Sequence, residues 1–447
     1  MLGGGIGQES DPPGGEGKYT NPVLFHNGRQ VQEKGYCTDI YFRRALQWIK
    51  DTEKTGKPFF VYLATNAPHS PVHDVPEALY QKYKLMNLAD DQFPQEKGHP
   101  LPGTADLDRR ARIYAMITNI DDNIGLLFRE LQVENLVTNT VVMFMVDNGP
   151  NGARYVAGMR GKKTEVYEGG IRSPLFVHWP ARLTAGPKSD EVVAHIDILP
   201  TLLDICGVPV PADLQLDGRS FLPLLTGNSR GWPDRAIVLQ AHRGDQPVAY
   251  HNFALRTRHW KLLNASGFHQ ESLDGEPQFE LYDMLNDPLE MQNLAEALPD
   301  TLRRLKSDYD RWFNDVSHTR PDNYAPPRIP IGTAYQNTVV LTRQDWRKIS
   351  ENPWLEEATG FWRLFNGQSA KYNILVRFRK PGNKGMVHLK IGEKEYRQPL
   401  QKQTPEIIFE NTIIDEGPIN LQAWLEMPGR KIDGCWQVEV KNGGMIK

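Results

Sequence analysis

The stretch from Val142 to Pro174 contains side chains that are able to bind both a cation and an anion. It reads VMFMVDNGPNGARYVAGMRGKKTEVYEGGIRSP. An apolar run ends at Asp147 and Asn148, whose carboxylate and amide oxygens suit a hard cation such as Ca²⁺ or Mg²⁺. Basic residues that would neutralise a bound anion follow: Arg160, Lys162, Lys163 and Arg172. The stretch therefore predicts a metal and anion site, although Asp-Asn-Gly is also a common turn and the basic residues would also suit a solvated loop.

A histidine follows a second apolar run in a similar way. Residues 59–64, FFVYLA, lead directly into TNAPHSP, in which His69 lies between two prolines. The prolines stiffen the backbone on either side of the imidazole. A rigidly held imidazole beside an anion can bind that anion or move a proton. A loop histidine without a chemical role is the alternative interpretation.

The elements that carry these residues predict an α/β fold. Apolar runs over 59–64, 141–146 and 175–179 are typical of strands buried on both faces. Segments with helical spacing separate them, over 38–53, 107–131 and 192–205, and Thr38 and Asp197 are expected to cap the first and last of these helices. Alternating strands and helices predict a mainly parallel sheet with flanking helices.

Ligands of such a sheet lie beyond the carboxyl ends of its strands. The candidate residues all follow strand ends, so we expect them to converge at one edge of the sheet. They are Asp147, Asn148, Lys163 and His69.

Composition and charge limit the classes of partner. A net charge of −3 argues against a protein that binds nucleic acid or an anionic membrane. No run approaches the roughly 18 apolar residues of a membrane span. The three cysteines, at 37, 206 and 435, lie far apart and have neither zinc-site nor Cys-x-x-Cys spacing. We therefore expect buried thiols, no nucleic-acid partner and no membrane span.

The pattern of elements changes twice along the chain of 447 residues. Residues 1–231 form the predicted α/β domain, and 232–318 read as a small α+β subdomain. A proline-rich linker is expected over 319–336. Apolar residues then alternate with a period of two, which predicts a β-sandwich over 337–447. Five of the ten tryptophans lie there, at 346, 354, 362, 424 and 436, as core residues or alternatively as a sugar-binding platform.

Several of these blocks resemble the sulfatases, a branch of the alkaline-phosphatase superfamily. GYCTDI, FFVYLATNAPHSP, FMVDNG and MRGKKTEVYEGGIRSP occur in the order and spacing of that family. FALRTRHWKLL and ELYDMLNDPLEMQNLA resemble the C-terminal subdomain of bacterial arylsulfatases. The resemblance covers residues 1–318 and implies an alkaline-phosphatase-like fold and the hydrolysis of aryl or carbohydrate sulfate esters.

The resemblance also implies roles for individual residues. Asp147 and Asn148 match a pair of calcium ligands, and Lys163 and His69 match residues that contact the substrate sulfate. The implied cofactor is Ca²⁺, and the implied partner is a sulfated small molecule or glycan. Other acids lie in stretches that recur in the family, but capping or packing explains them: Asp39, Asp121, Asp122 and Asp197.

One part of the family pattern is missing. Sulfatases use a formylglycine that is made from Cys or Ser in a Cys/Ser-x-Pro/Ala-x-Arg motif, and no cysteine or serine of this chain begins such a motif. The opening GGGIGQ itself resembles a mid-chain sulfatase loop. We therefore expect that the chain starts inside a sulfatase and is inactive alone. Calcium binding should be weak with two ligands, because Ca²⁺ takes six to eight oxygens.

Two other functions remain open at this point. The first is a phosphatase or phosphodiesterase of the same superfamily, which would use a Thr or Ser nucleophile and two zinc ions with His ligands. The Tyr-Glu-Gly-Gly stretch and the single His69 favour sulfate instead. The second is a degenerate sulfatase that binds a sulfated glycan without hydrolysing it.

Overall fold

The computed structural model describes residues 18–92, 97–101, 103–184, 186, 189–244, 246–318, 327–348, 355–379, 384–400, 404–429 and 431–445. They form two compact units. The first unit contains the described residues up to Cys37 and those from Pro327 onwards, and the second contains Thr38–Pro326. Within the described part, no helix combines the length and the apolarity that a membrane crossing requires.

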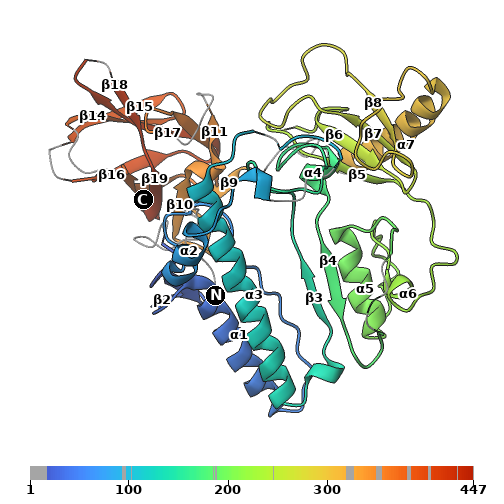
Figure 1. Ribbon diagram of the computed structural model, residues 1–447. Coiled ribbons are helices and arrows are strands. Elements are labelled where there is room, and N and C mark those ends of the chain that lie inside the picture. Colours follow the sequence, from blue (N-terminus) through green and yellow to red (C-terminus); the bar gives the residue numbers. More distant parts are fainter. Residues whose placement is uncertain are drawn as a thin grey trace. The chain divides into compact units, whose positions relative to one another are not determined.

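Two long helices of the second unit confirm the predictions from periodicity. Helix α1 is Cys37–Glu53 and helix α3 is Leu107–Val133, and they lie side by side (Figure 1). The Lys50 ammonium joins them through Glu130, with Nζ 2.7 Å from Oε2. Helix α1 begins at Cys37, so Thr38 lies inside its first turn and is not the cap that we predicted.

In the described part of the second unit, the predicted parallel sheet is not observed. Strands β3 (Val142–Met145) and β4 (Leu175–His178) pair with each other in antiparallel orientation. Residues 59–64 are assigned to no strand, and Phe60 and Tyr62 are 69% and 84% exposed. A strand buried on both faces needs neighbours on both edges. An apolar run in a sequence does not reveal whether those neighbours are present, which is why this prediction was wrong.

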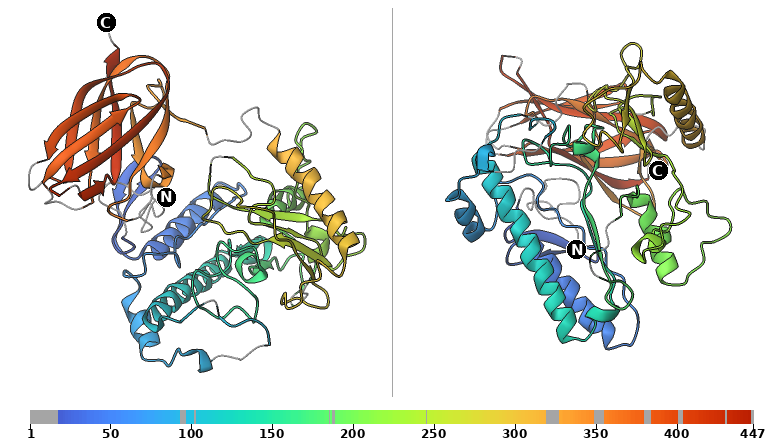
Figure 2. Two further views of the ribbon diagram at one scale, coloured as in Figure 1. Left: turned by 90° about the horizontal axis from the view of Figure 1, so that it is seen from above. Right: turned by 45° about the vertical axis from the view of Figure 1, so that its right-hand side comes forward.

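The C-terminal part of the second unit is an antiparallel sheet in the order β5-β6-β7-β8. Its strands are Ile237–Gln240, Phe253–Arg256, Trp260–Asn264 and Glu280–Asp283. Helix α7, Pro299–Ser317, covers one face (Figures 1 and 2). The apolar side chains of that face pack against Leu305 and Tyr309 of the helix. These strands and this helix lie within residues 232–318, which we predicted to be a small α+β subdomain.

The remaining helices of the second unit are short. The α-helices are α2 (Glu77–Lys84), α4 (Glu168–Ile171), α5 (Ile198–Ile205) and α6 (Leu222–Leu225). The 3-10 helices are η1 (Asp90–Gln92), η2 (Val137–Asn139) and η3 (His195–Asp197). Helix α4 contains Glu168, Gly169 and Gly170 of the Tyr-Glu-Gly-Gly sequence, and Tyr167 precedes its first residue.

The first unit is built almost wholly of strands. Strands β1 (Val23–His26) and β2 (Arg29–Gln32) form a hairpin. A four-stranded sheet has the order β10-β19-β13-β16, and a seven-stranded sheet has β11-β12-β17-β14-β15 with β9 beside β12 and β18 beside β17. These strands are β9 (Ile329–Ile331), β10 (Thr338–Thr342), β11 (Arg347–Lys348), β12 (Gly360–Asn366), β13 (Ala370–Arg377), β14 (Gly385–Ile391), β15 (Lys394–Leu400), β16 (Glu406–Ile414), β17 (Gly417–Met427), β18 (Lys431–Gly434) and β19 (Gln437–Met445). A 3-10 helix, η4 (Arg343–Asp345), follows β10.

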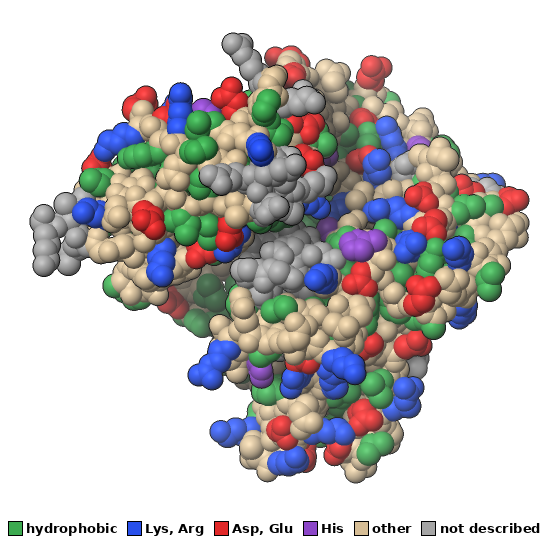
Figure 3. Space-filling view, turned by 90° about the vertical axis from the view of Figure 1, so that its left-hand side faces the viewer, with side chains coloured by type: hydrophobic (Ala, Val, Ile, Leu, Met, Phe, Trp, Pro, Cys, Tyr) green, Lys and Arg blue, Asp and Glu red, His purple; other side chains and the backbone are tan. Residues whose placement is uncertain are grey.

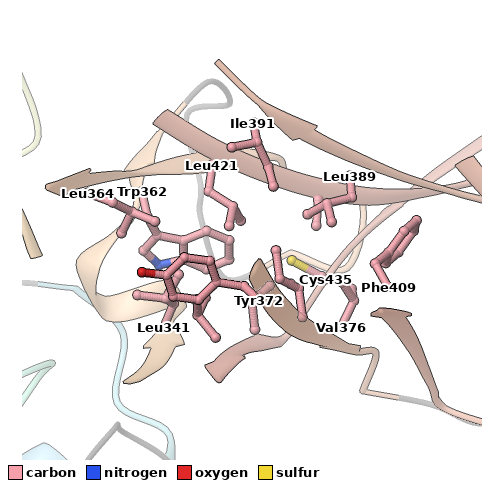
Figure 4. Packing of buried hydrophobic residues seen from close by; sticks show 14 of the residues in the cluster. Leu341, Trp362, Leu364, Tyr372, Val376, Leu389, Ile391, Phe409, Leu421 and Cys435 are labelled. Atoms are coloured by element: carbon pink, nitrogen blue, oxygen red, sulfur yellow. The ribbon is translucent and has the colours of Figure 1, made fainter. Parts of the chain in front are cut away.

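The two larger sheets share one core. Trp362 and Leu421 from one sheet and Tyr372 and Val376 from the other point toward one another (Figure 4). The residues with period-two spacing over 374–378, 387–391 and 421–425 are buried in this core, as their alternation indicates. Of the tryptophans considered for a sugar platform, Trp346 and Trp362 are buried, which excludes both from such a surface.

Some predictions fall on or near segments that are not described. The glycine-rich opening over 1–17, the first eight residues of the predicted linker (319–326) and Trp354 lie outside the described residues. Within the rest of the predicted linker, Ile329–Ile331 forms β9 and pairs with β12. On the face that Figure 3 shows, acidic and basic side chains are interspersed, in keeping with the small net charge.

Candidate functional site

The Tyr-Glu-Gly-Gly turn, residues 167–170, lies beside the end of strand β3. The backbone N–H of Gly149 donates to the Gly170 carbonyl over 2.8 Å. A Cβ atom on Gly149 would lie 1.8 Å from the Gly169 carbonyl oxygen, which no side chain tolerates. Gly149 is therefore required because the two backbones approach each other closely. This contact fixes the Asp147-Asn148 segment relative to the turn.

The glycines of the turn, Gly169 and Gly170, allow an equally close backbone contact with the loop that contains Lys163. The Gly169 N–H donates to the Arg160 carbonyl over 2.7 Å. A Cβ atom on Gly169 would lie 2.5 Å from that carbonyl oxygen, and one on Gly170 would lie 2.1 Å from the Glu165 carbonyl oxygen. The loop over 160–165 therefore packs directly on a turn that has no side chains at these positions.

Lys163 lies in this loop with its ammonium available. Its backbone N–H donates to the Pro150 carbonyl over 2.9 Å, so the loop also contacts the segment that follows Asn148. The side chain is half-buried. Within the described ranges, no carboxylate lies at salt-bridge distance from its Nζ atom. A partly desolvated ammonium without a carboxylate partner is suited to bind an anion.

Asp147 and Asn148 offer only part of a calcium site. Asp147 is exposed, and its Oδ1 atom accepts a hydrogen bond of 2.9 Å from the Asn148 backbone N–H. The Asn148 amide donates to the Gly149 carbonyl over 3.0 Å. Among the described residues, no three His, Cys, Asp or Glu side chains are grouped so that they could hold a metal ion. Two oxygens do not satisfy Ca²⁺, so these residues do not fit a complete calcium site.

His69 is exposed in its proline-flanked loop. Its Nδ1 atom lies 2.7 Å from the Ser70 carbonyl oxygen, and the Ser70 hydroxyl accepts a hydrogen bond of 3.0 Å from Arg109 in helix α3. The bond from Arg109 tethers the loop to the first turn of α3. The convergence of His69 with Asp147, Asn148 and Lys163 at one edge of a sheet stays a prediction, because the bonds described above link only the latter three.

The sheet β5–β8 presents its second face to the Tyr-Glu-Gly-Gly turn. Side chains alternate between the faces of a strand, so Phe253, Leu255 and Leu262 face helix α7 while their neighbours face the turn. Register places Arg256, Lys261 and Tyr282 side by side across three strands. Val166 and Tyr167 pack on the apolar side chains of this second face: Ala254, Leu263, Tyr282 and Met284.

A buried ion network ties Glu168 of the turn to this face. The Lys261 ammonium lies 3.1 Å from Glu168 Oε1 and 2.6 Å from Glu290 Oε1. Glu290 also accepts a hydrogen bond of 2.9 Å from the Glu168 backbone N–H, and Arg256 Nε lies 3.4 Å from Glu168 Oε1. Lys261, Glu168 and Glu290 are at most 3% exposed, so these charges interact in a medium of low dielectric constant.

The two carboxyls of this network differ in pKa. Burial acts to raise the pKa of the Glu168 carboxyl, but Lys261 and Arg256 outweigh it and hold that pKa below its ordinary value. Burial raises the pKa of the Glu290 carboxyl, against the opposing effect of Lys261. The difference arises because Glu168 contacts two cations, whereas Glu290 contacts one cation and lies beside the Glu168 carboxylate.

A second cluster holds the start of the loop. The Tyr167 hydroxyl donates to Glu280 Oε1 over 2.6 Å, and Arg160 Nη1 lies 3.2 Å from Glu280 Oε2. The Arg160 guanidinium also lies over the Tyr167 ring, 3.8 Å from its centre. Burial and the bond to Glu280 raise the pKa of the Tyr167 hydroxyl. Arg160, predicted as an anion-neutralising residue, is thus paired with a carboxylate and is not available for an anion.

Two of the other acids noted in the sequence, Asp39 and Asp197, have structural roles, whereas Asp121 and Asp122 are exposed. Asp39 accepts hydrogen bonds from Asn119 and Asn123 of α3, at 2.8 and 2.7 Å. Asp197 is fully buried and pairs with the Arg235 guanidinium. Its side chain makes no capping bond to α5, in contrast to our prediction, and accepts from the Ala194 N–H instead.

Sequence reasoning missed the residues that hold the turn. Glu168 lies inside the quoted stretch, but Lys261 and Glu290 lie 93 and 122 residues further along the chain. One signal was available: Lys261 lies between Trp260 and Leu262 in a mostly apolar strand, and it shares a face with Leu263. A lysine at such a position needs a buried partner.

Comparison with known proteins identifies the family of the chain. The sulfatase family model matches residues 8–208, and the model of the N-sulphoglucosamine sulphohydrolase C-terminal region matches residues 160–308. The two matches overlap across the Lys163 loop and the Tyr-Glu-Gly-Gly turn. The second match includes the whole of the sheet β5–β8 that holds them.

Individual relatives are sulfatases as well. The uncharacterized sulfatase YdeN of Escherichia coli K12 is 31% identical over 232 residues, which cover 50% of this chain and 37% of that protein. The N-acetylglucosamine-6-O-sulfatase of Bacteroides thetaiotaomicron is 26% identical over 357 residues, which cover 62% and 61%. This chain therefore spans less than two thirds of the length of either relative.

A solved structure extends the likeness to three dimensions. That of i-CgsB in complex with k-i-k-neocarrahexaose has 26% sequence identity and a TM-score of 0.51, and the likeness covers 65% of this chain and 57% of that one. The matched portion has a mixed α/β fold in both. From its family matches and its relatives, the chain belongs to the sulfatase family.

Proposed function

We propose that this chain is the sulfate-binding part of a sulfuric-ester hydrolase that acts on aryl or carbohydrate sulfate esters. The observation that carries the proposal is the Lys163 ammonium, which is half-buried, lacks a carboxylate partner among the described residues, and lies on a loop bonded to the segment after Asp147 and Asn148. A sulfate ester presents a monoanionic group, and one positioned ammonium matches that charge.

The chemistry of the remaining residues supports binding more than turnover. Lys163 would stabilise charge on the sulfate oxygens, and His69 would contact or orient the ester. The sequence holds no Cys/Ser-x-Pro/Ala-x-Arg motif, so it offers no formylglycine nucleophile. Sulfatases generally bind Ca²⁺, and a bound cation would add positive charge beside the sulfate. Asp147 and Asn148 would hold such an ion only together with further oxygen ligands.

Carbohydrate sulfates are the favoured class of substrate. One relative is an N-acetylglucosamine-6-O-sulfatase, and one structural neighbour was solved with a neocarrahexaose. A sulfate ester carries one charge at neutral pH, whereas a phosphate ester carries up to two. The family resemblance assigns a single lysine, Lys163, to the anion, which matches the charge of the sulfate ester better.

A comparison of two chromogenic esters tests the class of reaction. Repurified chain is incubated with 4-nitrophenyl sulfate and with 4-nitrophenyl phosphate, and release of 4-nitrophenol is followed by absorbance. We expect no release from either ester above buffer, and weaker binding of the phosphate than of the sulfate in a parallel titration. Release of 4-nitrophenol from the sulfate that Lys163→Ala abolishes would refute the expected inactivity. Preferential binding of the phosphate would move the chain to the phosphatase branch.

A further inference from the structure

Four buried or partly buried charges gather where the sheet β5–β8 meets the Tyr-Glu-Gly-Gly turn. Lys261 and Arg256 provide the positive charges, and Glu168 and Glu290 provide the negative ones. None of them belongs to the predicted sulfate site. Burying a charge is unfavourable unless it is paired, so a network of this kind is retained where it holds a defined geometry.

Lys261 is the centre of this network. Its Nζ atom is the only atom of the four residues that contacts both carboxylates, at 3.1 and 2.6 Å. Glu168 begins helix α4, and its backbone N–H donates to Glu290. The ammonium therefore fixes the side chain of Glu168 directly and its backbone through Glu290.

The position of the Tyr-Glu-Gly-Gly turn determines where Lys163 lies. The backbone of the loop over 160–165 packs against Gly169 and Gly170. The Gly170 carbonyl also accepts the hydrogen bond from the Gly149 N–H. A shift of the turn would therefore move both the Lys163 loop and the segment after β3. Lys261 is therefore connected to Lys163 through the Glu168 side chain, the backbone of the turn and the backbone of the loop over 160–165.

We propose that Lys261 is a positioning residue for Lys163: by binding Glu168 and Glu290 together, it fixes the turn on which the sulfate-binding loop packs. The role of Lys261 in sulfate binding rests on the function proposed above for Lys163. Its role in fixing the turn does not rest on that function, because the position of the turn can be followed from backbone amides without any ligand.

Hydrogen exchange tests the effect on the turn without any ligand. The reporters are the amides of Gly149, Lys163 and Gly169, whose acceptors lie across the turn. In Lys261→Met we expect exchange of the peptides that contain them to accelerate about tenfold or more. Amides of helix α3 and of strands β12 and β17 should keep their rates. Unchanged exchange around the turn would overturn the proposal.

The chain offers a matched control. Lys50 also binds two glutamates, Glu130 at 2.7 Å and Glu134 at 3.1 Å, but its side chain is 31% exposed. Lys50→Met should leave exchange around the turn unchanged. If Lys261→Met does not fold, Glu290→Gln replaces it, since it removes one charge and keeps a hydrogen-bonding group. That variant should give the same local acceleration, and its failure to do so would equally contradict the proposal.

A double-mutant cycle separates positioning from general stability. Affinity for 4-nitrophenyl sulfate is measured in the parent chain, Lys261→Met, Lys163→Ala and the double variant. We expect Lys261→Met to lower affinity about tenfold in the parent and to have no further effect once Lys163 is removed. Equal losses in both backgrounds would show that Lys261 does not act through Lys163. If Lys163→Ala has no effect, the proposed sulfate-binding role fails, while the exchange result still decides whether Lys261 fixes the turn.

Discussion

Two groups of apolar strands in the second unit differ in what covers them. In the sheet β5–β8, Phe253 and Leu262 are fully buried on the face that helix α7 covers, and the Tyr-Glu-Gly-Gly turn packs on the other face. In the pair β3–β4, Phe176 is 64% exposed and Met145 is 42% exposed. The residue types are the same, but only the first group has the neighbours that remove them from water.

This difference indicates which part of the unit holds the candidate site in place. The Lys163 loop contacts the turn, and the turn packs on the covered sheet. Asp147 and Asn148 follow strand β3, on the less covered side. The position of Lys163 is therefore expected to depend on residues of β5–β8 more than on residues of β3 and β4.

The largest expected effect compares two phenylalanines, one from each group. Phe253→Ala should lower the free energy of unfolding by about 3–5 kcal/mol, because a fully buried aromatic ring is lost and a cavity remains. Phe176→Ala should change it by no more than about 0.5 kcal/mol. Urea unfolding followed by circular dichroism of the helices measures both. Equal losses for the two variants would contradict the difference in burial between the Phe253 and Phe176 rings.

A second expectation concerns the charge on Glu168. Its pKa is lowered in the folded protein from an ordinary value of 4.5, so its carboxylate contributes stability above about pH 4.5 that is lost as the pH falls through the folded pKa. Glu168→Gln should therefore be about 3 kcal/mol less stable than the parent at pH 7. The difference should shrink as the pH is lowered toward 4 and below. A difference that is constant across this range would show that the charge of Glu168 does not matter.

The junction between the two groups can be tested at Gly149. Gly149→Ala places a methyl group 1.8 Å from the Gly169 carbonyl oxygen, and the overpacking should cost about 1–3 kcal/mol. Gly125→Ala is the control, because a methyl group there meets only the Arg129 side chain at 3.5 Å. That change should stabilise helix α3 by about 0.5–1 kcal/mol. Thermal unfolding of both variants would reveal opposite shifts, and a stabilising effect of Gly149→Ala would contradict the close approach.

The test with the smallest perturbation is chemical labelling of the cysteine thiols, which requires no substitution. All three cysteines are described: Cys206 is exposed, Cys37 is buried, and burial raises the pKa of the Cys435 thiol to about 12. Iodoacetamide at pH 8 should therefore modify Cys206 rapidly and Cys435 only on unfolding. Mass spectrometry of the labelled peptides gives the rates. Rapid labelling of Cys435 would show that the two-sheet core of the first unit opens readily.

The sequence was informative where residues act through their neighbours in the chain. Periodicity predicted α1 and α3, and alternation predicted the strands of the two-sheet core. The segment over 59–64 was misread because an apolar run does not show whether strands lie beside it. Lys163 was proposed from its local sequence, whereas Lys261 was not, since its contacts with Glu168 and Glu290 are visible only in the folded chain.

The central claim is that Lys163 binds the sulfate group, and its neighbour Lys162 provides the closest control. Both lysines are half-buried in the same loop, so general electrostatic attraction would be weakened about equally by removing either. Affinity for 4-nitrophenyl sulfate, measured by isothermal titration calorimetry at fixed ionic strength, should fall about tenfold or more in Lys163→Ala, because a charged hydrogen bond is worth roughly 1.5–3 kcal/mol. It should fall less than about threefold in Lys162→Ala. Equal losses in the two variants, or no loss in Lys163→Ala, would contradict the account.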